Sequence, residues 1–481
     1  MIETIEIVEM KNYIENIQEV LERDLCIGCG VCAVHTNEKK MNFDDYGKYK
    51  PDIDVKLIDS VCPFVQTETN DETKLAQEIF DTEQYSYDSI AGYYTKSYAG
   101  YVQAGDYRQS GSSGGTVSWL LDQLFTNGLI DGVIHVKNSS QDENIFEYSI
   151  SESSSEIKNG SKSKYYPITL ESVLKEINKT GKRYALVAVP CFIKAVRKLQ
   201  KIDETYRNAI VFYVGIVCGH LKSKSFSEFL SWQLDVMPNN ISRVNFREKL
   251  KGRGASTYAF SVVDKQGNKK IKPMPELQGA DWGEGLFKLK GCDYCDDALG
   301  ELADVVVGDA WLPKYRKDSR GTNIILSRNK IIDQLIELGI KNGSLHYDNI
   351  PISDILDSQS SGIRQKTQGL CYYLSRDIKN GAKIPRKRST MNVSDISPER
   401  RNIYFYREKL RESSHELYST SKENNDLEQF LSFMKPLSFI YQSKVHGSIF
   451  NLARYKFKIK IINIFRSVSK TRCKPEYNDE K

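Results

Sequence analysis

Short runs of apolar residues recur through the middle of the chain and predict the strands of a buried sheet. The segments YALVAVP (184–190), AIVFYVGIVC (209–218) and VVV (305–307) are apolar at almost every position. A strand that helices cover on both faces has no polar side, so such runs are typical of parallel strands. A helical pattern, FIKAVRKLQ, follows the first run. The predicted core is therefore α/β with a mostly parallel sheet.

Other patterns place further elements around this core. TKSYAGYVQ (95–103) alternates between apolar and polar residues as a strand does. MNFDDYGKYKPDI and TYAFSVVDKQGNKKIKPM predict hairpins that turn at Tyr46–Gly47 and Gln266–Gly267. Ser397 before Pro398 predicts the start of a long helix.

The length of the chain, 481 residues, is too great for one hydrophobic core. Changes in composition divide it into four parts. Residues 1–70 form a small ferredoxin-like α+β module, 71–95 a polar linker, 96–375 the α/β domain, and 376–481 a helical, basic C-terminal region.

Four cysteines in the first module have the spacing of an iron–sulfur site. Cys26, Cys29 and Cys32 form a close triplet, and Cys62 stands before a proline. In two-cluster ferredoxins the run is C-x2-C-x2-C-x3-C-P, and its fourth cysteine binds the other cluster. Here that fourth cysteine is absent, so the set matches one [4Fe–4S] cluster. A zinc knuckle is the alternative, although zinc sites favour two spaced pairs.

Four more cysteines lie near ends of the predicted core strands. Cys191 and Cys218 end two of the apolar runs, and Cys292 and Cys295 precede the third. Ligand sites of open α/β sheets gather at the carboxyl ends of the strands. We therefore expect these four cysteines to bind a second cluster. The alternative is that they are buried free cysteines, which pack as small apolar residues.

A loop of small residues, Gly111–Gly115, precedes the apolar helical run 116–125. Such a loop at a helix N-terminus offers free N–H groups to an anion, and a phosphate or pyrophosphate suits it. The loop matches neither the Walker nor the dinucleotide-binding pattern, and similar loops also serve only to cap helices.

Charge adds one asymmetry to this picture. The chain carries 68 Lys and Arg against 63 Asp and Glu, but from Arg376 onward the counts are 23 and 12. The basic and apolar segment 451–470 either lies on a membrane or protein surface or packs on its own domain.

We expect a cytoplasmic protein, because no signal peptide and no run of about 20 apolar residues is present. Nothing indicates a nucleic-acid partner or a hydrolytic site.

Several segments together resemble one known family. RQSGSSGGTVSWLL, GSKSKYYP, VAVPCFIKAVRKL, GIVCGH, VNFREK, CDYCDDALGELADVVVGDAW and GTNIILSR occur in this order. They are similar to the beta subunits of coenzyme F420-reducing hydrogenases and dehydrogenases, over about 95–375. The resemblance implies an α/β flavoprotein with FAD, [4Fe–4S] clusters and reactivity with coenzyme F420. It implies core cluster ligands at Cys191, Cys218, Cys292 and Cys295, and a flavin near Arg108, Lys164 and the loop that contains Ser112, Ser113, Gly114 and Gly115. The basic group Arg247, Lys249, Lys251 and Arg253 would, with this loop, offset the charge of phosphate.

The predicted function is an oxidoreductase that contains FAD and two [4Fe–4S] clusters. It would pass electrons between an external carrier such as ferredoxin and an organic two-electron partner, coenzyme F420 or a similar compound. Two alternatives stay open: a reductive step in surface polysaccharide biosynthesis, and a non-enzymatic electron-transfer or metal-stabilised scaffold.

Overall fold

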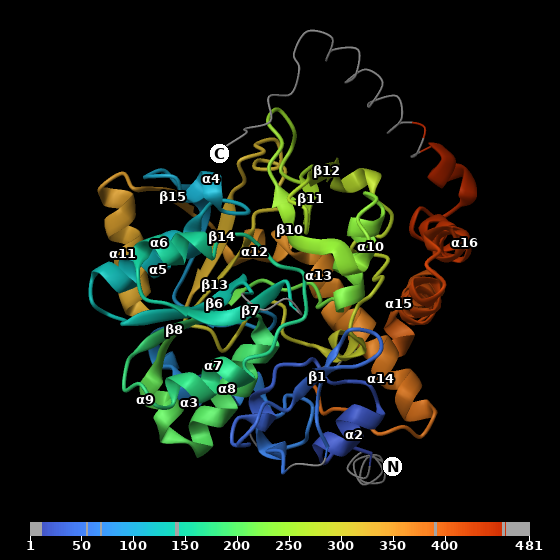
Figure 1. Ribbon diagram of the computed structural model, residues 1–481. Coiled ribbons are helices and arrows are strands. Elements are labelled where there is room, and N and C mark those ends of the chain that lie inside the picture. The colour runs from blue at the N-terminus through green and yellow to red at the C-terminus, as the bar shows by residue number, and fades with distance from the viewer. Residues whose placement is uncertain are drawn as a thin grey trace.

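The computed structural model describes residues 12–53, 56–67, 70–139, 144–388, 392–454 and 457. A sheet of eight strands lies at its centre, with helices on both faces (Figure 1). In spatial order the strands are β15 (Leu345–Asn349), β5 (Lys96–Val102), β14 (Asn323–Ser327), β13 (Val305–Asp309), β9 (Ile210–Ile216), β8 (Tyr184–Ala188), β6 (Gly132–Asn138) and β7 (Phe146–Ser151).

The sheet is mixed. Its four neighbouring strands β13, β9, β8 and β6 run parallel, and they are the predicted parallel core. The strands outside these four are antiparallel to their neighbours. No helix stands between β13 and β14, so this connection has no crossover unit of the kind that joins parallel strands.

Helices cover the two faces of the sheet with separate apolar clusters. On one face Trp119 and Leu120 of α5 and Ile332 of α11 pack with strand residues such as Val214. On the other face α7 and α8 pack against the same strands, with Phe192 among the buried side chains. These helices are α5 (Thr116–Thr126), α11 (Lys330–Lys341), α7 (Glu171–Ile177) and α8 (Pro190–Ile202).

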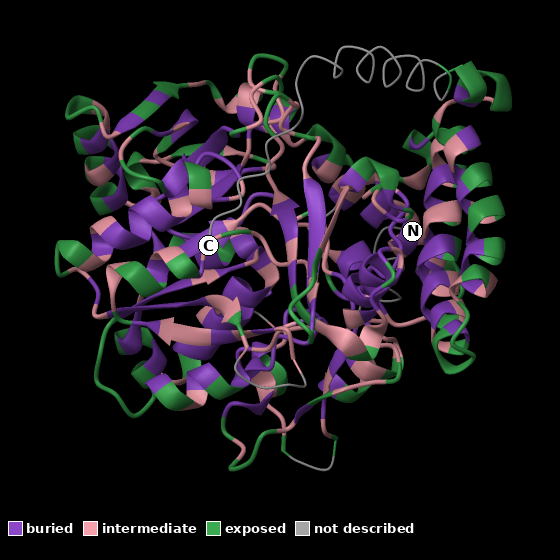
Figure 2. Cartoon of the chain, turned by 45° about the horizontal axis from the view of Figure 1, so that its top comes forward, coloured by how far each residue is buried: buried purple, intermediate pink, exposed green. Residues whose placement is uncertain are grey.

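A second, three-stranded antiparallel sheet stands beside the first. Its strands are β10 (Ile241–Glu248), β11 (Ala259–Asp264) and β12 (Lys269–Pro273). Phe246 and Phe260 of this sheet share a buried cluster with α10 (Lys224–Trp232) and the C-terminal helices α15 (Pro398–Glu423) and α16 (Leu427–Val445). Buried residues concentrate in the central strands, and exposed ones lie on the outward sides of the helices (Figure 2). The predicted helix start is confirmed, since Ser397 Oγ accepts a hydrogen bond from Arg400 N.

The N-terminal module is compact and short of regular structure. It contains α2 (Ile17–Glu22), the predicted hairpin of β1 (Met41–Phe43) and β2 (Tyr49–Pro51), and two 3-10 turns, η1 (Val31–Ala33) and η2 (Asp59–Val61). It packs into the same apolar cluster as α7 and α8.

Several elements were not predicted from the sequence. The polar stretch 137–164 contains β7 and α6, and the expected linker contains a hairpin of β3 and β4. The remaining elements are α3 (Glu72–Ile79), η3 (Thr82–Gln84), β3 (Ser86–Asp88), β4 (Gly92–Tyr94), α4 (Tyr107–Ser110), α6 (Ser154–Asn159), α9 (Glu204–Ala209), η4 (Pro238–Asn240), η5 (Met274–Glu276), η6 (Lys290–Tyr294), α12 (Ile352–Ser358), α13 (Ser360–Arg364), the π-helix η7 (Gln365–Gly369), α14 (Leu370–Lys379) and η8 (Val393–Asp395).

Candidate functional site

Cys26, Cys29, Cys32 and Cys62, here called the N-terminal thiol group, come together although 30 residues separate the last from the third. The loop between them turns on two glycines in the left-handed region, with φ of 74° and 76°. The first has no room for a side chain, because a Cβ at Gly28 would lie 2.8 Å from Tyr49 Cβ. Glycine is thus required where the chain winds around the thiols.

Burial governs the electrostatics of this group. The pKa of Cys26 is raised to about 11, mainly by burial and in smaller part by the neighbouring Cys62 thiol. Burial also raises the pKa of Cys29 and of Cys32, and the other cysteines of the group add to both shifts. Four mutually repelling thiolates are therefore unfavourable here unless a metal centre takes up their charge.

Cys191, Cys218, Cys292 and Cys295, here called the core thiol group, line one cavity that encloses about 310 Å³ of space, some of it open to solvent. Cys191 lies in the first turn of α8, directly after β8, and Cys218 follows β9 by two residues. Cys292 lies within η6, and Cys295 ends it. The two parallel strands thus deliver two thiols to the edge of the sheet, and the η6 turn supplies the other two.

Two donors outside the group point at its sulfurs. Leu221 N donates to Cys292 Sγ at 3.2 Å, and Lys366 Nζ donates to Cys295 Sγ at 2.8 Å. Lys366 is 5% exposed. Burial lowers the pKa of Lys366, but the thiolates of Cys295, Cys218 and Cys292 outweigh it and the pKa lies above its ordinary value. Donors of this kind favour charged sulfur at the site.

The arrangement differs from that of a single bound ion. In the described part of the chain, no three Cys, His, Asp or Glu side chains converge as ligands of one metal ion. A four-cysteine zinc site holds its sulfurs about 2.3 Å from one point. The core thiols line a cavity without such a point of convergence among the described residues.

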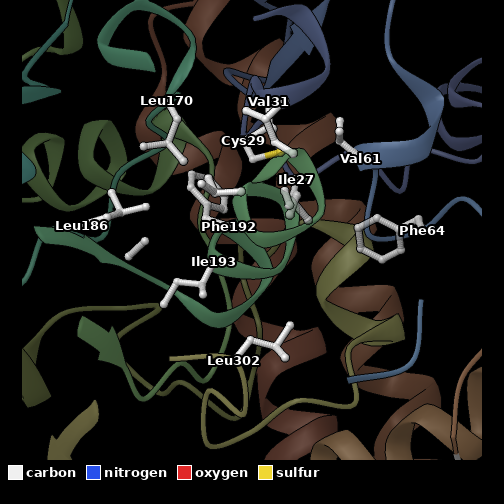
Figure 3. Packing of buried hydrophobic residues seen from close by; sticks show 14 of the residues in the cluster. Ile27, Cys29, Val31, Val61, Phe64, Leu170, Leu186, Phe192, Ile193 and Leu302 are labelled. Carbon is white, nitrogen blue, oxygen red and sulfur yellow. The ribbon is translucent and has the colours of Figure 1, made fainter. Parts of the chain in front are cut away.

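The two thiol groups are close neighbours. Ile27 and Phe64 of the N-terminal module line the core cavity beside Cys191 and Cys218. The backbones approach so tightly that a Cβ at Gly291 would lie 2.2 Å from Leu25 O. Figure 3 shows Ile27, Cys29 and Phe64 packed with Phe192 of α8 in one apolar cluster.

The Gly/Ser loop, residues Gly111–Gly115, precedes α5 as predicted. Gly115 has a φ of 87° and is the N-cap residue of that helix. Ser112 Oγ accepts from Ser163 N at 2.7 Å, and Ser113 Oγ donates to Thr322 O at 2.9 Å. A Cβ at Gly114 would lie 2.6 Å from Asn323 Oδ1, so this glycine permits the close packing of the loop on β14.

Basic side chains surround this loop. Arg108 is buried and donates to Gly321 O, and Lys249 Nζ donates to Ser113 O at 3.0 Å. Burial, reinforced by Arg108, Lys162 and Arg247, lowers the pKa of Lys249 to about 7. Burial likewise lowers the pKa of Lys164 to about 7. Arg108 pairs with Asp318 and Arg247 with Asp309, so both cations are partly compensated. Lys249 is still repelled by them, and an anion bound here would offset that repulsion.

A chain of contacts joins the loop to the core cavity. Arg247 Nη2 lies 3.5 Å from Ser112 O, and its Nη1 donates to the Tyr165 hydroxyl at 3.3 Å. The Tyr165 ring contacts Trp282 edge-on at 4.8 Å between centroids, and Trp282 contacts His220 in the same way at 4.4 Å. His220 lines the core cavity. Side-chain contacts thus run without a break from the loop to the core cavity.

Sequence reasoning found the eight cysteines and the loop but missed several other groups. Lys366 and Trp282 belong to no motif that predicts a site, and the fold alone brings them in. Lys249 and His220 lie within the segments VNFREK and GIVCGH, but His220 had no predicted role. Lone His35 lies at the surface, with its Nε2 3.0 Å from Asp203 Oδ2. Cys473 and most of the basic segment 451–470 lie outside the described residues, so the membrane contact stays a prediction. No helix among the described residues is long and apolar enough to cross a bilayer.

Comparisons with known proteins agree with the resemblance. Residues 97–175 match the family model of the coenzyme F420 hydrogenase/dehydrogenase beta subunit N-terminus, and residues 181–352 match that of its C terminus. One relative is a subunit of the F(420)H(2) dehydrogenase of Methanosarcina mazei, 21% identical over 374 residues, which are 74% of this chain and 95% of that protein.

Two further relatives are matched over less of their length. The F420-dependent formate dehydrogenase 1 subunit beta of Methanococcus maripaludis is 24% identical over 44% of this chain and 51% of that protein. The coenzyme F420-dependent sulfite reductase of Methanocaldococcus jannaschii is 26% identical over 61% of this chain and 43% of that protein. This chain thus spans about half of each.

Among solved structures, a chain of the F420-reducing [NiFe] hydrogenase complex from Methanosarcina barkeri is similar with a TM-score of 0.45 and 19% identity, over 58% of this chain and 92% of that one. The two family matches together span just over half of the sequence, including the Gly/Ser loop and the core thiol group. The chain belongs to the coenzyme F420 hydrogenase/dehydrogenase beta subunit family, a family of oxidoreductase subunits.

Proposed function

We propose that this chain is an iron–sulfur flavoprotein that passes electrons between an external one-electron carrier, such as a ferredoxin, and an organic two-electron partner. The observation that carries the proposal is the core thiol group. Four cysteines from three separate parts of the chain line one cavity, and a buried ammonium donates to one of the sulfurs. A buried cation beside four thiols is favourable only if negative charge resides there.

Each thiol group would hold one [4Fe–4S] cluster, which exchanges single electrons. The donor set supports this assignment, since four thiolates are the usual ligands of such clusters. Gly28 N lies 3.4 Å from Cys26 Sγ and Leu221 N lies 3.2 Å from Cys292 Sγ, so backbone donors already stabilise charge on the sulfurs. Three thiols of each group are half-buried, so exposure does not distinguish the two groups. The N-terminal group is the proposed contact for the external carrier, because the core group is the one connected through Trp282 and Tyr165 to the proposed flavin loop.

The Gly/Ser loop would hold the phosphates of FAD, which links two-electron and one-electron chemistry. The loop supplies N–H groups at the N-terminus of α5, and Arg108, Lys249 and Lys164 supply positive charge. Arg247 Nε is buried and has no hydrogen-bond partner among the described residues, so this side chain has a donor left for a ligand. These features fit an anionic cofactor, and contacts through Tyr165 and Trp282 extend from there to the core thiols.

Coenzyme F420 is the proposed organic partner. The support is the family match and the names of three relatives, which refer to F420 or its reduced form. Surface polysaccharide biosynthesis has no support from these relatives and stays a prediction.

The test is to purify and reconstitute the protein without oxygen and to count iron, sulfide and flavin per chain. We expect two four-iron centres and one FAD. Replacing Cys295 with Ala should remove about four irons and leave the N-terminal centre. Replacing Cys62 with Ala should remove the iron of the N-terminal centre and leave the core centre. Oxidation of reduced coenzyme F420 by the loaded protein, followed at its visible absorption, tests the partner.

Cys371 provides the control, because it is a buried cysteine that belongs to neither group. Cys371→Ala should keep the full iron content. Zinc in place of iron, with no flavin, would select the metal-stabilised scaffold instead. Equal iron loss in the Cys295 and Cys371 variants would contradict the assignment of the ligands.

A further inference from the structure

Lys366 has an unusual place in the fold. It lies in the five-residue π-helix η7, between α13 and α14, outside the segments that match the family models. Single π-turns inside helices are rare and occur often at functional sites. Here the wider turn accompanies a long polar side chain that is 5% exposed and lines the core cavity.

The ammonium of Lys366 has a sulfur as its partner in place of a carboxylate. Its hydrogen bond goes to Cys295 Sγ at 2.8 Å, and no Asp or Glu forms an ion pair with it in the described part of the chain. Asp297 is a nearby acid, but its carboxylate accepts hydrogen bonds from the backbone N–H groups of Leu299, Gly300 and Glu301. The charge of Lys366 is therefore directed at the core thiol group.

The N-terminal thiol group has a buried lysine of a different kind. Lys198 is 2% exposed, and its Nζ donates to Cys62 O at 2.9 Å and to Asn70 Oδ1 at 3.2 Å. It thus contacts the carbonyl of a cysteine and not its sulfur. The two lysines are similar in burial and differ in the atom that they contact.

We propose that Lys366 sets the reduction potential of the core centre by placing its ammonium on Cys295 Sγ. This inference rests on the proposed function. Reduction adds one electron, delivered from the flavin, to the centre and its thiolates, and no covalent bond forms or breaks. The ammonium stabilises the added negative charge in a low-dielectric site, and it keeps its proton throughout. Hydrogen bonds to the sulfurs and net local charge are two of the factors that set such potentials. Lys366 therefore raises the potential of the core centre.

The experiment is a redox titration of the full-length, reconstituted protein, followed by electron paramagnetic resonance of the reduced centres. Lys366→Met should make the potential of the core centre more negative and leave the N-terminal centre unchanged. Lys366→Arg keeps the charge and should restore most of the wild-type potential. The Cys62→Ala variant, which retains the core centre, identifies which signal belongs to it.

Lys198→Met is the matched control, since it removes an equally buried ammonium that contacts no core sulfur. It should leave the core potential unchanged. Full iron content in Lys366→Met with an unchanged core potential would overturn the inference while leaving the proposed function intact. Loss of the core iron in the Met and Arg variants alike would also overturn it, because Lys366 would then hold the centre and not tune it. A wild-type protein without iron would instead refute the proposed function.

Discussion

Four lysines have their pKa lowered to about 7, with desolvation as the main cause for all of them. Lys198 and Lys222 are buried, while Lys164 and Lys249 are half-buried. Lys249 contacts the Gly/Ser loop, and Lys164 follows Ser163, whose N–H donates to that loop. Lys198 lies at the N-terminal thiols and Lys222 near Cys292. Strongly shifted groups concentrate at functional sites. Such lysines are stable as cations only next to an anion, so their positions support the same sites as the cysteines do.

The pH dependence of anion binding follows from Lys249. Its pKa is about 7 in the folded protein and about 10.4 in an unfolded chain. The unfolded chain therefore binds more protons between these values, and the stability of the protein without cofactor should rise with pH across this window. An anion that binds to protonated Lys249 should therefore bind more weakly as the pH rises.

Sulfate is a suitable probe, because its charge is constant over this range. Calorimetry on the flavin-free protein should give about tenfold weaker sulfate binding at pH 8 than at pH 6, from the loss of protonated lysine. Lys249→Arg stays charged and should flatten the profile, apart from the part that Lys164 contributes. If sulfate affinity fell equally steeply with pH in Lys249→Arg, Lys249 would not be the group that causes the pH dependence.

The cysteines of both thiol groups could be predicted from the sequence, but the side chains that contact them, such as Lys366, could not. Spacing identified the triplet with Cys62, and strand ends identified Cys191 and Cys218, because both signals are local in the sequence. Lys366 lies 71 residues beyond the cysteine that it contacts. Nothing in its own surroundings, QKTQG, distinguishes it from a surface lysine.

At the scale of elements, the site depends on how closely two loops approach. The turn η6 carries Cys292, and its Gly291 lies against the backbone of Leu25, next to Cys26. Each loop holds thiols of a different group. A side chain between them would therefore separate both groups at once.

Gly291→Ala tests this contact. The added methyl would meet Leu25 O at 2.2 Å, so one loop must move, and overpacking of this kind costs about 1–3 kcal/mol. Urea unfolding should show the loss, together with a lower iron content. Gly362→Ala is the control, because a Cβ there meets nothing within 4 Å and its position in α13 favours alanine. Equal effects of the two changes would contradict the role of the contact.

Most elements with a strong apolar pattern were predicted from the sequence, including β8, β9, α8 and both hairpins. The missed ones, β7 and the hairpin of β3 and β4, are short and partly exposed. Their residues are too polar to differ from a loop in sequence. The antiparallel half of the sheet was missed for another reason. β14 is buried at every position, as the parallel strands are, but it is antiparallel to both of its neighbours, so a continuous apolar run did not identify its direction.

At the scale of the whole molecule, the N-terminal module forms part of the wall of the core cavity. Phe64 is 3% exposed and borders both the core cavity and a neighbouring polar cavity lined by Glu72 and Lys387. The division into four domains stays a prediction, but the first and third segments share this wall. Neither thiol group is then enclosed by its own segment alone.

Phe64→Ala, a change in the N-terminal module, should therefore make the core cavity more accessible to solvent. We expect the protein to lose about 3–5 kcal/mol of stability and to release core iron faster to a chelator. Phe212→Ala removes a similarly buried ring on the other face of the sheet. It should cost comparable stability without faster iron release. Equal release rates in the two variants would show that Phe64 does not seal the cavity.

Residues 383 and 384, far from the N-terminal module in sequence, hydrogen-bond to it. Ile14 N donates to Ile384 O, Ile384 N donates to Asn12 O, and Arg23 reaches the carbonyl of Lys383, 360 residues later. At 5–20 residues per second, a ribosome needs roughly 20–70 s to make that interval. The N-terminal module thus leaves the ribosome well before residues 383 and 384, which pair with it. We expect its packing to be completed only after this late segment has been synthesised.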